Sequence, residues 1–346
     1  MNVNGEPARF GVIGTGRIGQ LHARNLASRV PDAELVIVAD AYLAAARACA
    51  AALDGVAVAE SPDALLARDD VDAVLICTST DTHAELIEAA AAAGKHVFCE
   101  KPIAMTLPEI DRALAAVERA GVALQVGFNR RFDATYARVR QAVASHEIGR
   151  PEMLHVISRD PAPPPLGYIR TSGGLFVDMA IHDFDMARFL IGDEVEEIYA
   201  TGGVLIDPAI GEAGDIDSAV AVLRFRNGVI GTIENSRRAT YGYDQRVEIL
   251  GSLGAVSTGN VFANMATISD AAGVRRDPPL HFFLERYEAS FVAEMAAFVE
   301  AVRNGSPTPV TGHDGRVPVV MALAADRSRR ECRPVRLEEI AAGGLE

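Results

Sequence analysis

Acid–base side chains occur together at two places in this chain. Lys101 follows Glu100 and precedes a proline, and the apolar residues 97–99 come directly before this pair. A buried strand would present the Lys101 ammonium group at its carboxyl end, although a structural Glu–Lys pair is the alternative. Further along, Asp178 and His182 are four residues apart. A carboxylate raises the affinity of a nearby imidazole for a proton, which suits a base that receives a proton from an alcohol.

The second pair lies in a segment with helical periodicity, residues 174–190. On one continuous helix, Asp178, His182 and Asp185 share a stripe that borders an apolar one. The same segment could hold a divalent metal, because carboxylates and imidazoles are its usual ligands. Asp183 would project about 100° away from His182, so we expect no metal site. A histidine that only caps a packed helix is the structural alternative.

A glycine-rich turn near the start has the spacing of a dinucleotide-binding loop. It reads Gly14-Thr15-Gly16-Arg17-Ile18-Gly19, after an apolar run and before a helix-like segment. Glycines here allow a tight turn and close approach of pyrophosphate to the amides of a helix N-terminus. Asp40 ends the next apolar run, where it can accept hydrogen bonds from the ribose hydroxyls and would repel a 2′-phosphate. We therefore expect NAD over NADP, with a helix N-cap as the alternative for Asp40.

Short apolar runs and alanine-rich helical segments alternate through the first part of the chain, which predicts a doubly wound parallel sheet. The expected strands are residues 10–13, 35–39, 56–58, 73–77, 97–98 and 124–126, and the expected helices are 18–28, 42–53, 83–93 and 107–120. Thr78-Ser79-Thr80 and Glu100-Lys101 follow two of these strands. Ligands bind beyond the carboxyl ends of such strands, so these segments point to a redox enzyme with a nicotinamide coenzyme.

After residue 127 the pattern changes to that of an antiparallel sheet. Runs 218–225 and 229–234 alternate and are separated by Asn227-Gly228, a strong hairpin signal. A helix is predicted over 282–303, and a final helix over about 316–330 is expected to pack on the first domain. We expect two domains, residues 1–127 for NAD binding and 128–346 for substrate binding and oligomerisation.

Composition narrows the class of protein. The 346 residues are 49% apolar and carry a formal net charge of −14, which repels nucleic acid and anionic membranes. The four cysteines have no paired spacing, and the chain lacks both a signal-like N-terminus and a membrane span. We expect a cytoplasmic protein with a neutral small-molecule substrate and no nucleic-acid or membrane partner.

Four segments together resemble the Gfo/Idh/MocA oxidoreductase family, within it most closely the bacterial inositol 2-dehydrogenases. These segments are RFGVIGTGRIG, CEKP, VGFNRRFD and FVDMAIHDFDMARFL. The resemblance implies a Rossmann domain followed by an α/β domain with a largely antiparallel open sheet. It also implies homotetramers or dimers assembled through that sheet, and a cis bond before Pro102.

The resemblance further implies NAD-dependent oxidation of a ring hydroxyl, most closely that of myo-inositol to 2-keto-inositol, in carbohydrate metabolism. In the resulting hypothesis His182 accepts the hydroxyl proton, Lys101 polarises the same oxygen and a hydride passes to nicotinamide C4. Asp178 positions the substrate and the lysine. The expected coenzyme contacts are Gly14, Thr15, Gly16, Arg17, Ile18, Gly19, Asp40, Thr78, Ser79, Thr80, His83, Glu100, Lys101 and Arg130. The expected substrate contacts are Lys101, Arg131, Asp160, Asp178, His182, Tyr241 and Tyr243.

Two other functions stay open at this point. An aldose, anhydrosugar or sugar-acid dehydrogenase would use the same catalytic set. If Arg131 clamps a carboxylate, a sugar acid is the expected substrate. Arginines in such motifs more often form structural ion pairs. A dinucleotide-binding regulator without catalysis would lack the lysine or the histidine. Because both are present, an enzyme is favoured.

Overall fold

The computed structural model describes residues 6–341, whose contacts divide them into two compact units. The first unit comprises residues 6–132 and 289–317, and the second comprises 133–288 and 318–341. Residues 289–317 therefore group with the N-terminal part, whereas the sequence-based domains place them in the second domain. The two divisions rest on different criteria, and the functional domain assignment stays a prediction.

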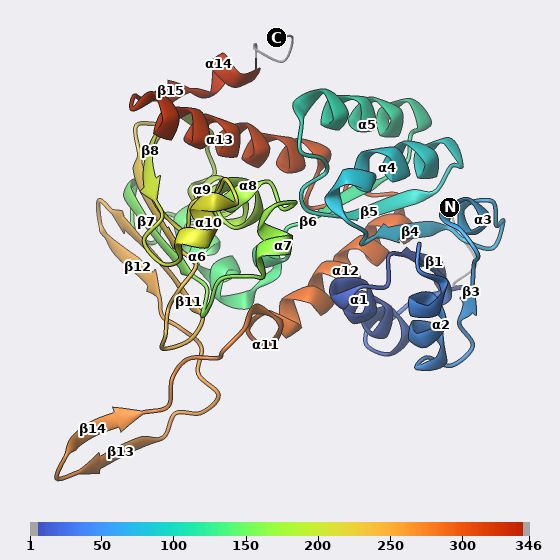
Figure 1. Cartoon of the computed structure of the whole chain (residues 1–346), viewed down its shortest axis with the longest axis horizontal. Helices are drawn as coiled ribbons and strands as arrows, with labels where there is room; N and C mark the ends of the chain where they lie inside the picture. Colours follow the sequence, from blue (N-terminus) through green and yellow to red (C-terminus); the bar gives the residue numbers. More distant parts are fainter. Residues whose placement is uncertain (1–5, 342–346) are drawn as a thin grey trace. The chain divides into compact units, whose positions relative to one another are not determined.

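The first unit contains a six-stranded parallel sheet in the order β3-β2-β1-β4-β5-β6 (Figure 1). This is the doubly wound order of dinucleotide-binding folds, and it confirms the predicted fold class. The strands are β1 Ala8–Ile13, β2 Ala33–Ala39, β3 Ala57–Val58, β4 Ala73–Ile76, β5 His96–Glu100 and β6 Leu124–Gly127. The helices are α1 Arg17–Ser28, α2 Leu43–Ala51, α3 Pro62–Leu66, α4 His83–Ala92, α5 Leu107–Ala120 and α12 Glu288–Asn304, with short 3₁₀ turns η1 Thr80–Thr82 and η2 Asn129–Phe132.

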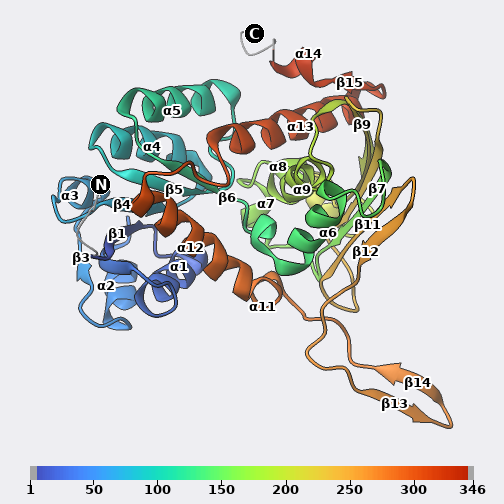
Figure 2. The ribbon, with the colours of Figure 1, turned by 180° about the vertical axis from the view of Figure 1, so that it is seen from behind.

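Helix α12 completes the core of this unit on the side of the sheet that α1 and α2 cover (Figure 2). Its buried Phe298 places its ring 6.0 Å from that of Phe10 and 5.9 Å from that of Phe98. Truncation of a buried phenylalanine typically costs about 3–5 kcal/mol. The helix is thus a structural part of the first unit, although more than 150 residues separate it from β6 in the sequence.

The second unit is built on a seven-stranded mixed sheet in the order β12-β11-β7-β10-β9-β8-β15. Only the β10–β7 pair of this sheet is parallel, so the largely antiparallel sheet is confirmed. The predicted hairpin joins β9 and β10, with Gly228 at φ +90° in its turn. The strands are β7 Pro151–Arg159, β8 Val195–Gly203, β9 Ser218–Phe225, β10 Ile230–Ser236, β11 Asp244–Gly251, β12 Gly254–Thr258 and β15 Val335–Arg336, with a separate hairpin of β13 Thr267–Asp270 and β14 Gly273–Arg276.

Helices cover one face of this sheet, and the opposite face is exposed (Figure 1). The helices are α6 Ala134–Ala144, α7 Leu166–Ile169, α8 Gly174–Asp178, α9 Ile181–Ile191, α10 Pro208–Glu212, α11 Phe283–Arg286, α13 Gly312–Glu331 and α14 Leu337–Ala341. Most of α13 belongs to the second unit, where the Ser328 hydroxyl accepts a hydrogen bond from the amide of Ala200. Its first residues belong to the first unit, where Arg316 pairs with Asp111.

The continuous helix predicted over residues 174–190 is wrong, because the structure has two helices, α8 and α9. At the junction the amides of Met179 and Ala180 both bond to the carbonyl of Leu175, and the His182 amide bonds to Met179. The regular pattern of helical backbone hydrogen bonds is therefore interrupted between Asp178 and His182. Asp178 and His182 therefore lie on different helices and not on one continuous helical face.

Candidate coenzyme and catalytic site

The three glycines after β1 have three different surroundings. A Cβ on Gly14, whose φ is +92°, would lie 2.7 Å from the backbone of Cys77 and Thr78. A Cβ on Gly19 would lie only 1.8 Å from the carbonyl oxygen of Gly14. Around Gly16, in contrast, nothing lies within 4 Å. The first and last glycines are therefore needed to fold the loop, and the middle one leaves open space for a ligand to approach the backbone.

Helix α1 begins directly after this loop and has the features of an anion-binding terminus. Its N-cap is Gly16, which has no side chain to satisfy the first amides, and its first turn contains no acidic residue. Unsatisfied amides and the positive end of the helix dipole attract phosphate groups. The residues present thus fit the pyrophosphate of a dinucleotide.

Asp40 follows β2 and connects it to the glycine-rich loop. Its Oδ2 accepts hydrogen bonds from the amide and hydroxyl of Thr15 at 2.6 and 2.9 Å, and its Oδ1 accepts from the amide of Tyr42 at 2.8 Å. Burial acts to raise the pKa of Asp40, but these hydrogen bonds lower it overall. The N-cap of α2 is Tyr42, not Asp40, so the capping alternative is wrong. A fixed negative charge stands where an adenosine ribose would be recognised.

The carboxyl end of β5 carries Glu100 and Lys101. Nε2 of His22 lies 2.8 Å from Oε1 of Glu100, whose side chain is 16% exposed, and the His22 side chain is fully buried. The peptide bond from Lys101 to Pro102 is cis, as the resemblance implies. Lys101 itself is half-buried. The Glu100 carboxylate thus has His22 as a partner, which a simple ion pair between Glu100 and Lys101 would not include.

His83, expected to contact the coenzyme, has both ring nitrogens near backbone carbonyls. Nδ1 lies 2.8 Å from the oxygen of Pro102, and Nε2 lies 3.1 Å from that of Thr78. Burial lowers the pKa of His83 despite these two acceptors. The ring connects the chain after β4 to the chain after Lys101. Nearby, the Thr82 hydroxyl donates to that of Thr78 at 2.7 Å.

The two arginines of η2 are both largely buried. Arg130 is 5% exposed, and Nη2 of Arg131 bonds to Oδ1 of Asp314 at 2.8 Å. Burial acts to raise the pKa of Asp314, whereas the Arg131 charge helps to lower it overall. Arg131 therefore forms the structural ion pair that the sequence left as its alternative role.

In the second unit, Asp178 belongs to a network of charged and polar groups. The Tyr168 hydroxyl donates to Oδ1 of Asp178 at 2.7 Å, and Nη1 of Arg237 bonds to Oδ2 at 3.2 Å. Burial, followed by the charge of Asp178, raises the pKa of the Tyr168 phenol, which therefore remains a donor. These contacts fix both oxygens of the Asp178 carboxylate.

Arg237 extends this network toward the start of α8. Its side chain is 1% exposed, and its Nη2 lies 3.3 Å from Oδ2 of Asp215. Oδ1 of Asp215 accepts a hydrogen bond from the Leu175 amide at 2.9 Å. One buried guanidinium thus holds two carboxylates, one of which anchors the helix that carries Asp178.

The polar residues at the start of the next helix, α9, differ in their surroundings. His182 is half-buried, whereas Asp183 and Asp185 are buried. Nδ2 of the Asn235 side chain donates a hydrogen bond to Oδ2 of Asp183 at 2.7 Å, which connects α9 to β10. Within residues 6–341, no group of three or more histidine, cysteine, aspartate or glutamate side chains is arranged to hold a metal ion.

The remaining expected substrate residues lie beyond the ends of β7 and β10. Asp160 is joined to the chain after β10 through backbone hydrogen bonds to Ser236 and Ala239. The Tyr241 hydroxyl donates to Asp244 at 2.6 Å and accepts from Arg159 at 2.7 Å. Tyr243 is buried, with its ring edge-on to that of Tyr287 at 6.1 Å.

Sequence reasoning missed the partners Tyr168, Arg237 and His22. Tyr168 lies just after a proline cluster, and Arg237 follows a predicted strand, so neither position carries a local signal. His22 had one, because it is a polar residue on the inner face of a helix. Contacts between distant segments define all three roles.

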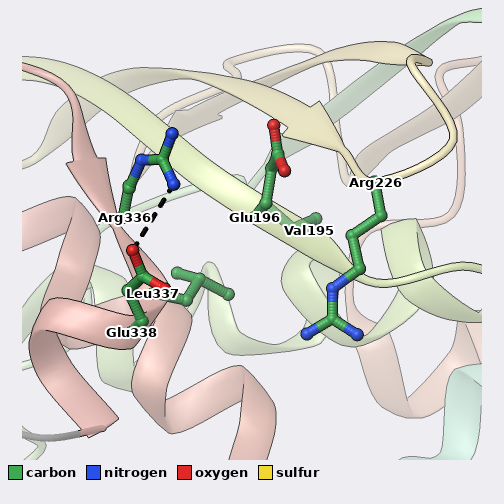
Figure 3. A pocket seen from close by; sticks show the side chains of 6 residues that line it. All are labelled: Val195, Glu196, Arg226, Arg336, Leu337 and Glu338. Carbon is green, nitrogen blue, oxygen red and sulfur yellow. Dashed lines mark hydrogen bonds and ion pairs between the residues drawn. The ribbon is translucent and has the colours of Figure 1, made fainter.

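A shallow surface pocket lies elsewhere in the second unit (Figure 3). It is lined by Val195, Glu196, Arg226, Arg336, Leu337 and Glu338. Arg336 and Glu338 form an ion pair on one side of it at 3.4 Å (Figure 3). None of the expected site residues belongs to this pocket. In the described part of the chain, every helix is too short or too polar to cross a membrane.

Comparison with known proteins identifies the class. Residues 8–128 match the model of an oxidoreductase family with an NAD-binding Rossmann fold, and residues 136–257 match the GFO/IDH/MocA C-terminal domain. The chain belongs to the Gfo/Idh/MocA oxidoreductase family. It is an NAD-dependent oxidoreductase, as the glycine-rich loop and Asp40 predict.

Similar proteins cover nearly the whole chain. A myo-inositol 2-dehydrogenase of Thermotoga maritima is 48% identical over 96% of this chain and 99% of its own length. An inositol 2-dehydrogenase of Rhizobium meliloti is 48% identical, with coverage of 94% and 98%. The scyllo-inositol dehydrogenase structure from Lactobacillus casei, with bound NAD(H) and scyllo-inositol, has a TM-score of 0.90 at 30% identity and covers 96% of this chain and 100% of its own.

Proposed function

We propose that this enzyme oxidises a ring hydroxyl of a cyclic polyol, myo-inositol, to the corresponding ketone, 2-keto-inositol, with NAD⁺ as the oxidant. The observation that carries the proposal is the similarity to two inositol 2-dehydrogenases, each 48% identical over at least 94% of this chain. The acid–base set of Lys101, Asp178 and His182 supports the same reaction class. A neutral polyol also agrees with the ion pair of Arg131 and Asp314, because that arginine already has a carboxylate partner.

When bound, NAD⁺ supplies the hydride acceptor for the carbon that carries the hydroxyl. Loss of the hydroxyl proton must accompany loss of the hydride, so a base is needed at that oxygen. We assign this role to His182, and we assign to Lys101 a hydrogen bond that polarises the same oxygen. General-base help of this kind is typically worth about 10²–10⁴ in rate.

Asp178 is assigned to position the substrate and the lysine. Its carboxylate is held on one oxygen by Tyr168 and on the other by Arg237, which supports a fixed orientation. The coenzyme would be held by the α1 terminus and the glycine-rich loop, with Asp40 at the adenosine ribose. Thr78, Ser79, Thr80, His83, Glu100 and Arg130 are proposed to contact the coenzyme or to shape its site.

We further propose a cytoplasmic homo-oligomer, a tetramer or dimer, that assembles through the open face of the second sheet. Alternating residues leave apolar side chains exposed on that face. They are Met153, Tyr199, Val220, Val222, Ile230 and Leu250, each between 39% and 50% exposed. An exposed apolar patch of this kind marks an interaction surface. The four cysteines are free thiols, in agreement with a reducing compartment.

A substrate panel tests the proposed function. Purified enzyme is given myo-inositol, scyllo-inositol, glucose or a uronic acid with NAD⁺ or NADP⁺, and reduced coenzyme is followed by absorbance. We expect the highest kcat/KM for myo-inositol with NAD⁺. A higher kcat/KM for glucose or the uronic acid would contradict the polyol assignment, and coenzyme binding without turnover of any substrate would favour a non-catalytic regulator.

A further inference from the structure

An acidic side chain is buried in the core of the first unit without a hydrogen-bond partner. Glu294 of α12 is 0% exposed, and neither of its carboxyl oxygens is hydrogen-bonded to any described residue. It occupies the apolar face of α12, between Phe291 and Phe298, where a hydrophobic residue would be expected. Burial of a carboxyl group without a hydrogen-bond partner costs free energy on folding. The presence of Glu294 at this position therefore requires an explanation.

The contacts of α12 place Glu294 behind the carboxyl end of β5. Nε2 of Gln125 on β6 donates to the backbone oxygen of Glu294 at 3.0 Å. One turn earlier, the Phe291 ring lies 5.7 Å from that of His22, which also packs edge-on against Phe98 at 5.2 Å. His22 in turn holds Glu100 at 2.8 Å. His22 therefore contacts both Glu100 and Phe291, which lies one turn before Glu294 on α12.

The second oxygen of Glu100 is also enclosed. A Cβ at Gly127, which is paired with Glu100 across β5 and β6, would lie 2.9 Å from Oε2 of Glu100. His22 on α1 and Gly127 on β6 thus orient the Glu100 carboxylate. The carboxylate also interacts electrostatically with its buried neighbours. Any charge that develops on Glu294 acts on a group that begins the Glu100-Lys101 segment.

The charge of Glu294 interacts with Glu100 on β5 and with Cys77 after β4. Cys99 on β5 interacts with Cys77 and Glu100, and His22 on α1 contacts Glu100 and Phe291. Burial, followed by the charge of Glu100, raises the pKa of Glu294 well above its usual value. Burial likewise raises the pKa of both thiols, and the glutamates add to this effect at Cys77. The surroundings of Glu294 and of the two thiols therefore favour their neutral forms.

We propose that Glu294 is a positioning residue for the coenzyme, which acts through Glu100 and His22 as a buried neutral acid. In its protonated form it leaves one negative charge at the end of β5. When it loses its proton, a second negative charge appears beside Glu100 in a medium of low polarity and repels it from its place. Coenzyme affinity then depends on an ionisation in the core. The inference rests on the proposed coenzyme contact of Glu100.

The test is the pH dependence of NADH binding, followed by the fluorescence of the bound coenzyme. For each protein, the dissociation constant is expressed relative to its own value at neutral pH. We expect affinity of the unmodified enzyme to fall about tenfold between neutral and alkaline pH. The fall is expected to be clearly smaller in Glu294→Gln, which has nearly the same shape and cannot ionise. Glu300→Gln, on the exposed side of the same helix, is the matched control and should follow the unmodified profile.

Superimposable profiles of the unmodified enzyme, Glu294→Gln and Glu300→Gln would overturn the proposal. So would a change confined to stability, with no difference in the coenzyme profile. If Glu294→Gln does not fold, Glu294→Met provides the same test with an apolar side chain. NADH binding requires no polyol, so this test is independent of the substrate assignment. Unchanged NADH affinity in Glu100→Gln would instead reject the coenzyme contact of Glu100.

Discussion

At the scale of single residues, the carboxylates of this enzyme differ chiefly in what surrounds them. Backbone amides at a strand end hold Asp40, and a phenol and a buried guanidinium hold Asp178. Among residues 6–341, no group forms a hydrogen bond with the Glu294 carboxyl group. Hydrogen bonds lower the pKa of Asp40, whereas burial raises the pKa of Glu294. The proposed roles of the three carboxyl groups therefore differ with their environments.

Coenzyme choice is predicted to depend on Asp40. In Asp40→Ser the ribose hydroxyls lose a charged acceptor and a 2′-phosphate no longer meets a negative charge. Hydrogen bonds to charged groups contribute about 1.5–3 kcal/mol, so the ratio of kcat/KM for NAD⁺ over NADP⁺ should fall at least about tenfold. The ratio is measured with myo-inositol at saturation, with the exposed Asp54→Ser as control. An unchanged ratio would rule out Asp40 as the selector.

Protein stability is predicted to depend on pH through Glu294. Because its pKa is raised in the folded state, folding retains a proton that the unfolded chain releases. This contribution to the free energy of unfolding is fully present below the pKa that Glu294 has in the unfolded chain. It is lost as the pH rises from that pKa through the higher pKa of the folded state. Melting temperatures of Glu294→Gln and unmodified enzyme should diverge with increasing pH, in favour of the variant. A constant difference across that range would show that Glu294 does not titrate in the fold.

At the scale of elements, the glycine-rich loop must fold tightly and must also leave space for the coenzyme. Substitutions at Gly19 and Gly16 can separate these two requirements. In Gly19→Ala the new methyl group collides with the Gly14 carbonyl, so the coenzyme-free protein should lose about 1–3 kcal/mol of stability. In Gly16→Ala the methyl group enters open space. That variant should keep its stability in urea but bind NADH more weakly, because the space lies where pyrophosphate approaches. Equal stability losses in both variants would contradict this division.

Much of the first sheet was predictable from sequence, because buried parallel strands appear as short apolar runs. Residues 107–120 were predicted as a helix, and α5 has these bounds. The break between α8 and α9 was missed because each side of Met179 has helical periodicity. Only the displaced hydrogen bonds to Leu175 reveal the break. Hydrophobic periodicity indicates which residues are buried, but it does not indicate which backbone hydrogen bonds connect them.

The candidate site was predictable only as residue types. Asp40 and the glycines follow strands that the pattern identifies, and the structure explains their placement. The roles of Arg237 and Tyr168 depend on segments 59 and 10 residues from Asp178 in the chain, which no local pattern connects. Glu294 could have been noticed as an acidic residue on an apolar helix face, although its link to Glu100 required the packing of α12.

At the scale of the whole molecule, the exposed sheet face predicts assembly. Val222 lies in its centre, opposite Tyr199 on β8 and Thr232 on β10. Val222→Asp would bury a charge in an interface and should dissociate the oligomer into smaller species, as measured by light scattering. Val222→Thr, similar in shape and uncharged, should keep the mass of the unmodified enzyme. A monomeric unmodified enzyme, or an oligomer that tolerates aspartate, would exclude this face as the interface.

Lys101 and His182 are proposed to serve one substrate hydroxyl, and this shared role is the central claim to test. The most direct measurement compares kcat for myo-inositol in Lys101→Met, His182→Asn and the double variant, with the melting temperature as the check on folding. Each single variant should lose about 10²–10⁴ in rate. Because groups that act in one step are not additive, the double variant should be no slower than the slower single variant. A loss equal to the product of the two single losses would contradict the shared role.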